Sequence, residues 1–214
     1  INVFAKCNLG FCYYPTEVGA VYPSLKRDLL GEMVEACHAR DIRVVAYFNL
    51  GLDHDAALRR REWCTMRPDG TVYAPDRLNH FFRQMCLNTG YGDYQEALVR
   101  EVLTRYPVDG IFLDCIHKTP CIGVECIEKM EAQGVDHADP AQLAAYARRR
   151  NAQYAARIRA VVPRDKLLYF NGIGYRDQEA FASHFELECL PAGAWGYQVF
   201  PARVRYLRTL GKPV

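Results

Sequence analysis

Acidic side chains at the ends of two apolar stretches are the strongest candidates for chemistry in this sequence. The stretch VDGIFLDC ends an apolar run on the carboxylate of Asp114, and HFELEC carries Glu186 and Glu188. Successive side chains of a strand point to opposite faces, so Glu186 and Glu188 share one face. Two carboxylates that face one pocket can hydrolyse a glycosidic bond, one as nucleophile or base and the other as proton donor.

The roles of these acids follow from their places. Asp114 is the predicted nucleophile, because a strand end is rigid and attack needs tight positioning. Glu188 is the better candidate for the acid/base, and Glu186, one step deeper along the strand, is the second. The alternatives are that Asp114 caps the next segment or pairs with Lys6, and that Glu186 pairs with an arginine. Only the separation of the carboxyl groups decides between retention and inversion.

Other predicted strands also turn polar towards their carboxyl ends. We expect these side chains, together with Glu186, to bind substrate at one mouth: Lys6, Asn8, Asn49 and Asn171. Trp195 and Tyr197 follow the Glu188 stretch in PAGAWGYQVFP, where aromatic rings could stack on the C–H faces of a sugar. The alternative for Trp195 is a ring folded onto the rim of the fold.

Short apolar runs alternate with amphipathic stretches along the chain, which indicates βαβ units and a parallel sheet. The expected strands are Val3–Cys7, Arg43–Leu50, Gly110–Ile116, Leu167–Asn171 and Phe185–Leu190, with the terminal GKPV as the start of another. The expected helices are Leu25–Arg40, Tyr94–Tyr106, Pro140–Val162 and Ala202–Leu210. Asp139 and Pro140 form a typical helix start, with an N-cap followed by proline in the first turn.

Two architectures fit this alternation, an open doubly wound sheet and a (β/α)8 barrel. The doubly wound sheet predicts a G-x-G-x-x-G turn, which neither NLGFCYYPT nor NGIGYRD provides. The barrel predicts polar residues at the carboxyl ends of many strands, and five strands have them. A barrel of this kind needs about 250 residues. We therefore expect residues 1–214 to form a single barrel-type domain of about six strand-helix units, truncated at both ends.

The composition bears on which classes of partner the protein binds and on the compartment in which it works. The net charge of +2 comes from mixed signs, so no nucleic-acid-binding surface is indicated. No apolar run approaches the roughly 18 residues of a membrane span. Nine scattered cysteines, an odd number, are typical of free thiols in a reducing compartment, so a cytoplasmic location is expected. No cofactor is expected.

A zinc site is the weaker interpretation of one cysteine-rich stretch. Cys115, His117, Cys121 and Cys126 have ligand chemistry within twelve residues. Structural zinc sites usually show two close cysteine pairs, whereas these spacings are loose and no second pair follows. The sequence therefore favours free thiols and no metal site.

The Asp114 strand and several other motifs resemble a known family. VDGIFLDC, preceded by YQEALVREVLTRYP, resembles the nucleophile strand of α-L-fucosidase-like glycoside hydrolases (family 29 and relatives), where a D-G-I-[FW]-[FL]-D motif ends on the catalytic Asp. The order of FAK, YYPT, LLGEMVEACHARDIRVVAYFNLGLDHDAA, CLN and VDGIFLD is similar to the hypothetical glycosyl hydrolase 6 domain. The resemblance implies a (β/α)8 barrel, a carbohydrate substrate and Asp114 as nucleophile. In some other retaining barrels whose nucleophile is an Asp of the fourth strand, the acid/base lies near the sixth strand, which is compatible with Glu188.

One departure from the family pattern bears on activity. Fucosidases carry K-H-H-D-G-F, whose histidines bind sugar, whereas this chain has KCNLGF from Lys6 to Phe11. The lysine, glycine and phenylalanine remain, and the histidines and aspartate do not. The alternative function is therefore a catalytically inactive carbohydrate-binding barrel descended from such enzymes. A metal-assisted hydrolase using Asp114 and His117 is disfavoured, because the sequence offers no ring of histidines.

Overall fold

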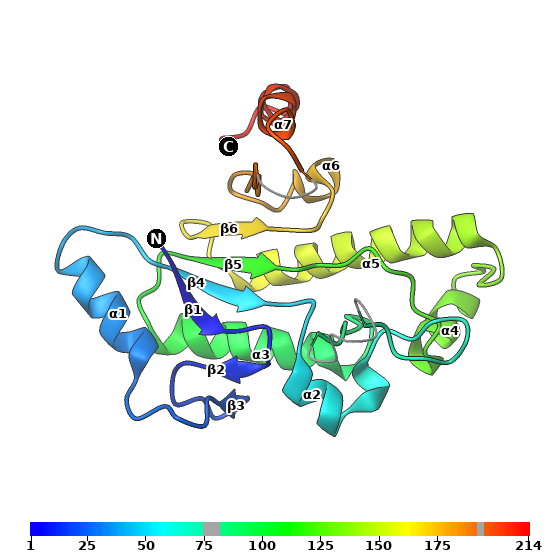
Figure 1. The fold of residues 1–214 in the computed structure, drawn as a ribbon, viewed down its shortest axis with the longest axis horizontal. Coiled ribbons are helices and arrows are strands. Elements are labelled where there is room, and N and C mark those ends of the chain that lie inside the picture. Colours follow the sequence, from blue (N-terminus) through cyan, green and yellow to red (C-terminus); the bar gives the residue numbers. More distant parts are fainter. Residues whose placement is uncertain (75–81, 192–194) are drawn as a thin grey trace.

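A mixed β-sheet is the centre of the computed structural model, which describes residues 1–74, 82–191 and 195–214. Within these ranges the strand order is β3-β2-β1-β4-β5-β6 (Figure 1). The strands are β1 Asn2–Lys6, β2 Phe11–Cys12, β3 Ala20–Val21, β4 Val45–Asn49, β5 Gly110–Asp114 and β6 Leu167–Phe170. Four of them, β1, β4, β5 and β6, are parallel neighbours, and β2 is antiparallel to β1.

Capping side chains fix where the longer helices begin. The helical elements are α1 Leu29–His38, α2 His54–Arg59, the 3₁₀ helix η1 Arg61–Trp63, α3 Gly90–Arg105, α4 Val124–Glu131, α5 Pro140–Val161, α6 Tyr175–Gln178 and α7 Val199–Arg208. The side chains of Asp28, Thr89 and Asp139 accept hydrogen bonds from backbone N–H groups in the first turns of α1, α3 and α5. None of the described helices is long and apolar enough to cross a membrane.

The parallel strands follow one another across the sheet in the order of the chain. Val45 of β4 pairs with Gly110 of β5, which in turn pairs with Leu167 of β6. A doubly wound sheet instead reverses its strand order at a switch point, and the described sheet has no reversal among these four strands. The predicted α/β arrangement with a parallel sheet is confirmed.

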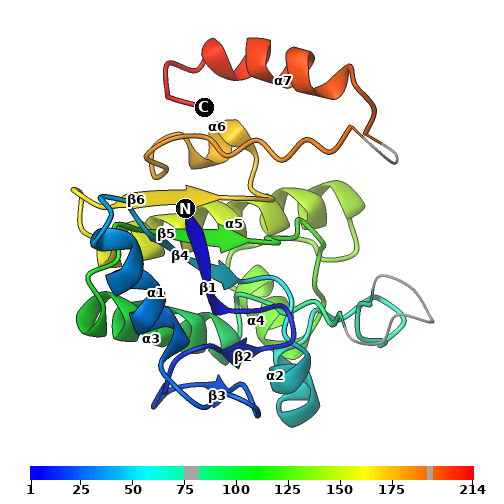
Figure 2. The same cartoon turned by 60° about the vertical axis from the view of Figure 1, so that its left-hand side comes forward.

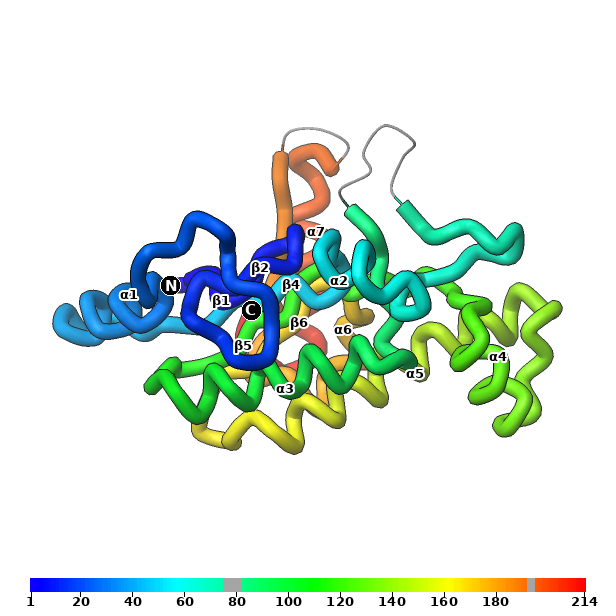
Figure 3. The backbone as a smooth tube through the Cα atoms, turned by 90° about the horizontal axis from the view of Figure 1, so that it is seen from below, coloured from blue at the N-terminus to red at the C-terminus, as the bar shows by residue number. Residues whose placement is uncertain are grey.

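The two faces of the sheet have different neighbours. Apolar side chains on one face, such as Ala46, Ile111 and Leu168, share a core with residues of α1, α3 and α5. Figure 3 shows α3 and α5 side by side along this face. The opposite face carries the aromatic row, which we define as Phe4, Tyr47, Phe112 and Tyr169. Its successive ring centroids lie 4.6, 5.4 and 4.6 Å apart.

The face that carries the aromatic row is concave. The Tyr169 hydroxyl on β6 donates to Asn2 Oδ1 on β1, although β4 and β5 lie between these strands. Adjacent strands are about 4.8 Å apart, so this contact requires the sheet to curve around the aromatic row. The strands that the structure describes do not close the sheet into a barrel.

The strand predicted for Phe185–Leu190 is absent from the sheet. Ser183 lies beside β6, where its N–H donates to Leu168 O, and Phe185 N–H then donates to Pro213 O in the terminal GKPV, which is not a strand either. Phe185 and Leu187 pack with Leu207 and Leu210, at and beyond the end of α7. Their alternation therefore reflects burial next to α7 and not a paired strand. Figure 2 shows α6 and α7 beyond β6.

Candidate active site

Asp114 ends β5 at a sharp turn of the backbone. Cys115, the next residue, has a φ of +60°, a left-handed conformation that is uncommon for residues other than glycine. The turn lets the Cys115 N–H donate to Asp114 Oδ1 at 2.7 Å. On the other side, the Tyr47 hydroxyl donates to Asp114 Oδ2 at 2.5 Å. Two donors, one from the turn after β5 and one from β4, thus fix both oxygens of this carboxylate.

Tyr47 and Asn49 support Asp114 from the neighbouring strand β4. Burial, and then the hydrogen bond to Asp114, raise the pKa of Tyr47 well above its usual range, so the hydroxyl keeps the proton that it donates. Asn49 Nδ2 donates to the Tyr47 hydroxyl at 3.2 Å, and Asn49 Oδ1 accepts from Leu52 N–H at 3.0 Å. Asn49 is buried, and its hydrogen bond to the Tyr47 hydroxyl positions that side chain.

Glu186 and Glu188 lie on the extended segment that follows β6 and α6. Glu188 is exposed, and its Oε2 accepts a hydrogen bond of 2.7 Å from Asn171 Nδ2. Glu186 is half-buried. Burial, followed by the negative charges of Glu188 and Asp114, raises the pKa of Glu186 from 4.5 to about 7. Asn171, which binds Glu188, also donates its backbone N–H to Leu113 O of β5 at 3.0 Å, so these carboxyl groups lie near the carboxyl ends of β5 and β6.

Lys6 does not lie in this region, and its predicted place at the mouth is wrong. A register shift between Phe4 and Lys6 pairs Lys6 with Phe48, whose side chain faces the helices. The bulge therefore turns Lys6 away from the face of the aromatic row. Its side chain is 0% exposed, and Nζ lies 2.9 Å from Asp53 Oδ2 and 3.0 Å from Asn49 O.

The remaining predicted residues differ in their burial and in their contacts. Asn8 is half-buried in the turn between β1 and β2, and no hydrogen bond within the described ranges joins it to Asp114. Trp195 is half-buried and stacks under the Arg203 guanidinium at 5.6 Å, and Arg203 Nη1 donates to Glu188 O at 3.2 Å. Tyr197 is 81% exposed. Trp195 is thus linked to the Glu188 segment through Arg203, whereas Tyr197 is free to contact solvent.

The structure adds the aromatic row and two histidines to this region. Tyr169 packs on His184, with ring centroids 4.3 Å apart, and burial lowers the pKa of His184. Burial also lowers the pKa of His117, whose buried Nε2 has no partner among the described residues. The alternation of β4, β5 and β6 is the signal that could have identified Tyr47, Phe112 and Tyr169.

One group of side chains in the described ranges has the composition of a metal site. It consists of Cys86, Cys121 and Cys126, with no carboxylate in it. Cys115 and His117 are not members, so the four-residue cluster considered from the sequence is not formed.

Comparison with known proteins gives both family and structural matches. The family model described as hypothetical glycosyl hydrolase 6 matches residues 1–115. Alpha-L-fucosidase isoenzyme 2 from Paenibacillus thiaminolyticus is 34% identical with a TM-score of 0.91, over 99% of this chain and 33% of that one. The chain thus spans about a third of the length of this structure. Among curated proteins, no match is found.

Two more distant structures share the fold. The PgaB glycoside hydrolase domain from Bordetella bronchiseptica is 12% identical with a TM-score of 0.73, over 98% of this chain and 70% of that one. The alpha-galactosidase TtGalA from Thermus thermophilus, in complex with stachyose, is 16% identical with a TM-score of 0.54. That match covers 75% of this chain and 31% of TtGalA.

Proposed function

The chain belongs to the hypothetical glycosyl hydrolase 6 family, and from that membership we propose that it is a glycosidase with Asp114 as nucleophile. The observation that carries this proposal is a pair of unlike acids in one region. Asp114 is held through both oxygens by donors, and Glu186 has a pKa raised to about 7. Glycosidases need one carboxylate and one carboxylic acid at the same pH.

The proposed architecture is a (β/α)8 barrel, of which residues 1–214 form a part. Its support is the sequential order of the four parallel strands and their concave face. In such a barrel the active site lies at the carboxyl ends of the strands. Asp114 is the last residue of β5, and Asn171 directly follows β6. The aromatic row would then line the interior of the barrel.

In the proposed retaining reaction, Asp114 attacks the anomeric carbon and forms a covalent glycosyl-enzyme. A carboxylic acid protonates the leaving oxygen, and the same group later takes a proton from the attacking water. Glu188 is the proton donor that the sequence predicts. The raised pKa makes Glu186 the stronger candidate, because a proton donor must hold its proton near neutral pH. The hydrogen bond from Asn171 would hold Glu188 in place, either as a carboxylate that binds the sugar or as the alternative proton donor.

A catalytically inactive carbohydrate-binding barrel is the second candidate. The burial of Lys6 against Asp53 favours it, because the lysine of the KCNLGF stretch then offers nothing to a sugar. Cys7 and Asn8 also stand where the related fucosidases have histidines. Both candidates bind a carbohydrate, and they differ in whether the bond to the sugar is cut.

The test compares four variants of the full chain on a panel of aryl glycosides that includes α-L-fucosides and α-galactosides. Asp114→Asn should abolish hydrolysis, and the loss of the proton donor should lower kcat/KM by roughly 10²–10⁴-fold. The larger loss between Glu186→Gln and Glu188→Gln identifies the donor. Asp165→Asn, an exposed carboxylate without a described ion pair, is the matched control.

Two results would contradict the proposal. Full activity in a folded Asp114→Asn protein, judged by far-ultraviolet circular dichroism, would remove Asp114 from the reaction. Sugar binding by the wild type without hydrolysis of any glycoside would favour the carbohydrate-binding barrel. The mass of a trapped glycosyl-enzyme, formed with a fluorinated substrate and located on Asp114, would distinguish retention from inversion.

A further inference from the structure

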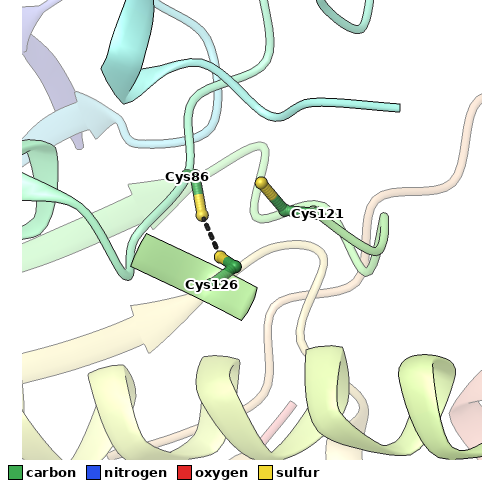
Figure 4. A group of neighbouring side chains, drawn as sticks. All are labelled: Cys86, Cys121 and Cys126. Carbon is green, nitrogen blue, oxygen red and sulfur yellow. Dashed lines mark hydrogen bonds between the residues drawn. The ribbon is translucent and has the colours of Figure 1, made fainter. Parts of the chain in front are cut away.

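Three buried cysteines from separate segments of the chain meet in one group. Cys86 precedes α3, Cys121 lies in the loop between β5 and α4, and Cys126 is in α4. Their sulfur atoms all lie within 4.8 Å of one another, and Cys86 and Cys126 are 3.3 Å apart (Figure 4). All three thiols are free, and all three side chains are closed to water.

The sulfur spacing fits a shared metal ion better than a covalent pair. A tetrahedral zinc site has Zn–S distances of about 2.3 Å, which places neighbouring sulfurs about 3.8 Å apart. The 3.3 Å between Cys86 and Cys126 and the upper limit of 4.8 Å for all three pairs are compatible with that value. A disulfide needs about 2.05 Å between two sulfurs and leaves the third without a role. A central ion would use all three.

Several N–H groups point at these sulfurs. The backbone N–H of Met66 donates to Cys121 Sγ at 3.3 Å, and that of Gly123 donates to the same atom at 3.4 Å. Asn88 Nδ2 donates to Cys126 Sγ at 3.4 Å. Outer-shell donors of this kind orient metal ligands and stabilise their charge. The surroundings are therefore built to accept thiolates.

Arg150 supplies the charge balance. Its side chain is buried, and its Nη1 donates to Cys86 Sγ at 3.9 Å. Its other partners are neutral oxygens of His117, Thr119 and Asn151, and no carboxylate in the described part of the chain pairs with it. A buried cation needs a nearby negative charge. Zn²⁺ with three thiolates carries a net charge of −1, which Arg150 would neutralise.

We propose that Cys86, Cys121 and Cys126 bind a zinc ion as thiolates, with Arg150 compensating the charge of the complex. The site is structural, because its ligands are buried and no carboxylate of the proposed reaction belongs to it. It ties the segment before α3 to the loop that begins directly after Asp114. This assignment is independent of the proposed glycosidase activity.

The test measures zinc in the full chain purified under reducing conditions without chelator, by inductively coupled plasma mass spectrometry. The wild type should hold stoichiometric zinc, and Cys86→Ser, Cys121→Ser and Cys126→Ser should lose it. Cys12→Ser, which changes an equally buried cysteine outside the group, should retain it. Arg150→Met should lower zinc affinity roughly 10–100-fold, as expected for a residue that supports the ligands.

A cobalt-substituted wild type keeps the test decisive even where a cysteine variant does not fold. Co²⁺ bound by three thiolates should give intense sulfur-to-cobalt charge-transfer absorption and the visible bands of tetrahedral cobalt. A wild type that binds neither Zn²⁺ nor Co²⁺ in reducing buffer overturns the proposal. Zinc that survives the three serine substitutions overturns it as well, as does a peptide map in which Cys86 and Cys126 form a disulfide in the protein as isolated.

Discussion

Replacing Lys6 with methionine should destabilise the fold without acting through the active site. Lys6 Nζ and Asp53 Oδ2 form an ion pair of 2.9 Å, in which the two side chains are 0% and 1% exposed. Asp53 also caps α2, because its Oδ1 accepts from Ala56 N–H at 2.8 Å. Lys6→Met fills nearly the same volume but leaves the Asp53 carboxylate buried without its cation.

The size of the effect follows from the burial of the pair. Removing one partner of a buried ion pair costs about 3–5 kcal/mol, because an uncompensated charge remains in the interior. Protein domains have unfolding free energies of about 5–15 kcal/mol, so this loss is a large fraction of the total. With urea m-values of about 2–3 kcal/mol/M for a chain of this size, the unfolding midpoint should fall by roughly 1–2.5 M.

Urea unfolding followed by circular dichroism measures this midpoint. Lys26→Met, which changes an exposed lysine, should leave the midpoint nearly unchanged. Adding Asp53→Asn to Lys6→Met should recover part of the loss, since the buried charge is then gone. A loss below about 1 kcal/mol, accompanied by a raised KM for glycosides, would refute the reasoning and place Lys6 at the mouth.

Two further predictions concern the region around Asp114. Wild-type kcat/KM should fall as the pH rises through about 7, because Glu186 then loses the proton that it would donate, and Glu186→Gln should lack this limb in a pH–rate profile. A flat wild-type profile would remove Glu186 as donor. Gly51→Ala should cost at least about 3 kcal/mol in thermal unfolding, since its Cβ would lie 1.5 Å from Cys115 O. Gly123→Ala, whose Cβ meets nothing nearer than 3.5 Å, is the tolerated control, and an equal Tm for both variants would contradict this packing.

The periodicity of apolar residues predicted the most regular strands and helices. The strands β1, β4, β5 and β6 lie where apolar alternation placed them, within one or two residues at each end. The helix α5 begins at Pro140 as predicted, because Asp139 and Pro140 determine that start locally. Asp114 and Asn171 follow from the same alternation, because a regular strand fixes which face each residue occupies.

Features that depend on tertiary contacts could not be predicted from apolar patterns in the sequence. One extra residue in β1 reverses the direction of Lys6, and nothing in the sequence VFAKCN marks that bulge. The alternation of Phe185–Leu190 arose from packing near α7, which an apolar pattern cannot distinguish from strand pairing. Cys86 lies far along the chain from Cys121 and Cys126, so their meeting depends on where α4 packs.

The sequential order of the parallel strands has a consequence for how the protein folds as it is made. Each of β4, β5 and β6 pairs with the parallel strand that left the ribosome before it. The pairing partner of each of β4, β5 and β6 is therefore already present when that strand emerges. Folding can then proceed from the N-terminus in steps of one strand and one helix. Asp114 gains its support from Tyr47 in such a step, before Glu186 has been synthesised.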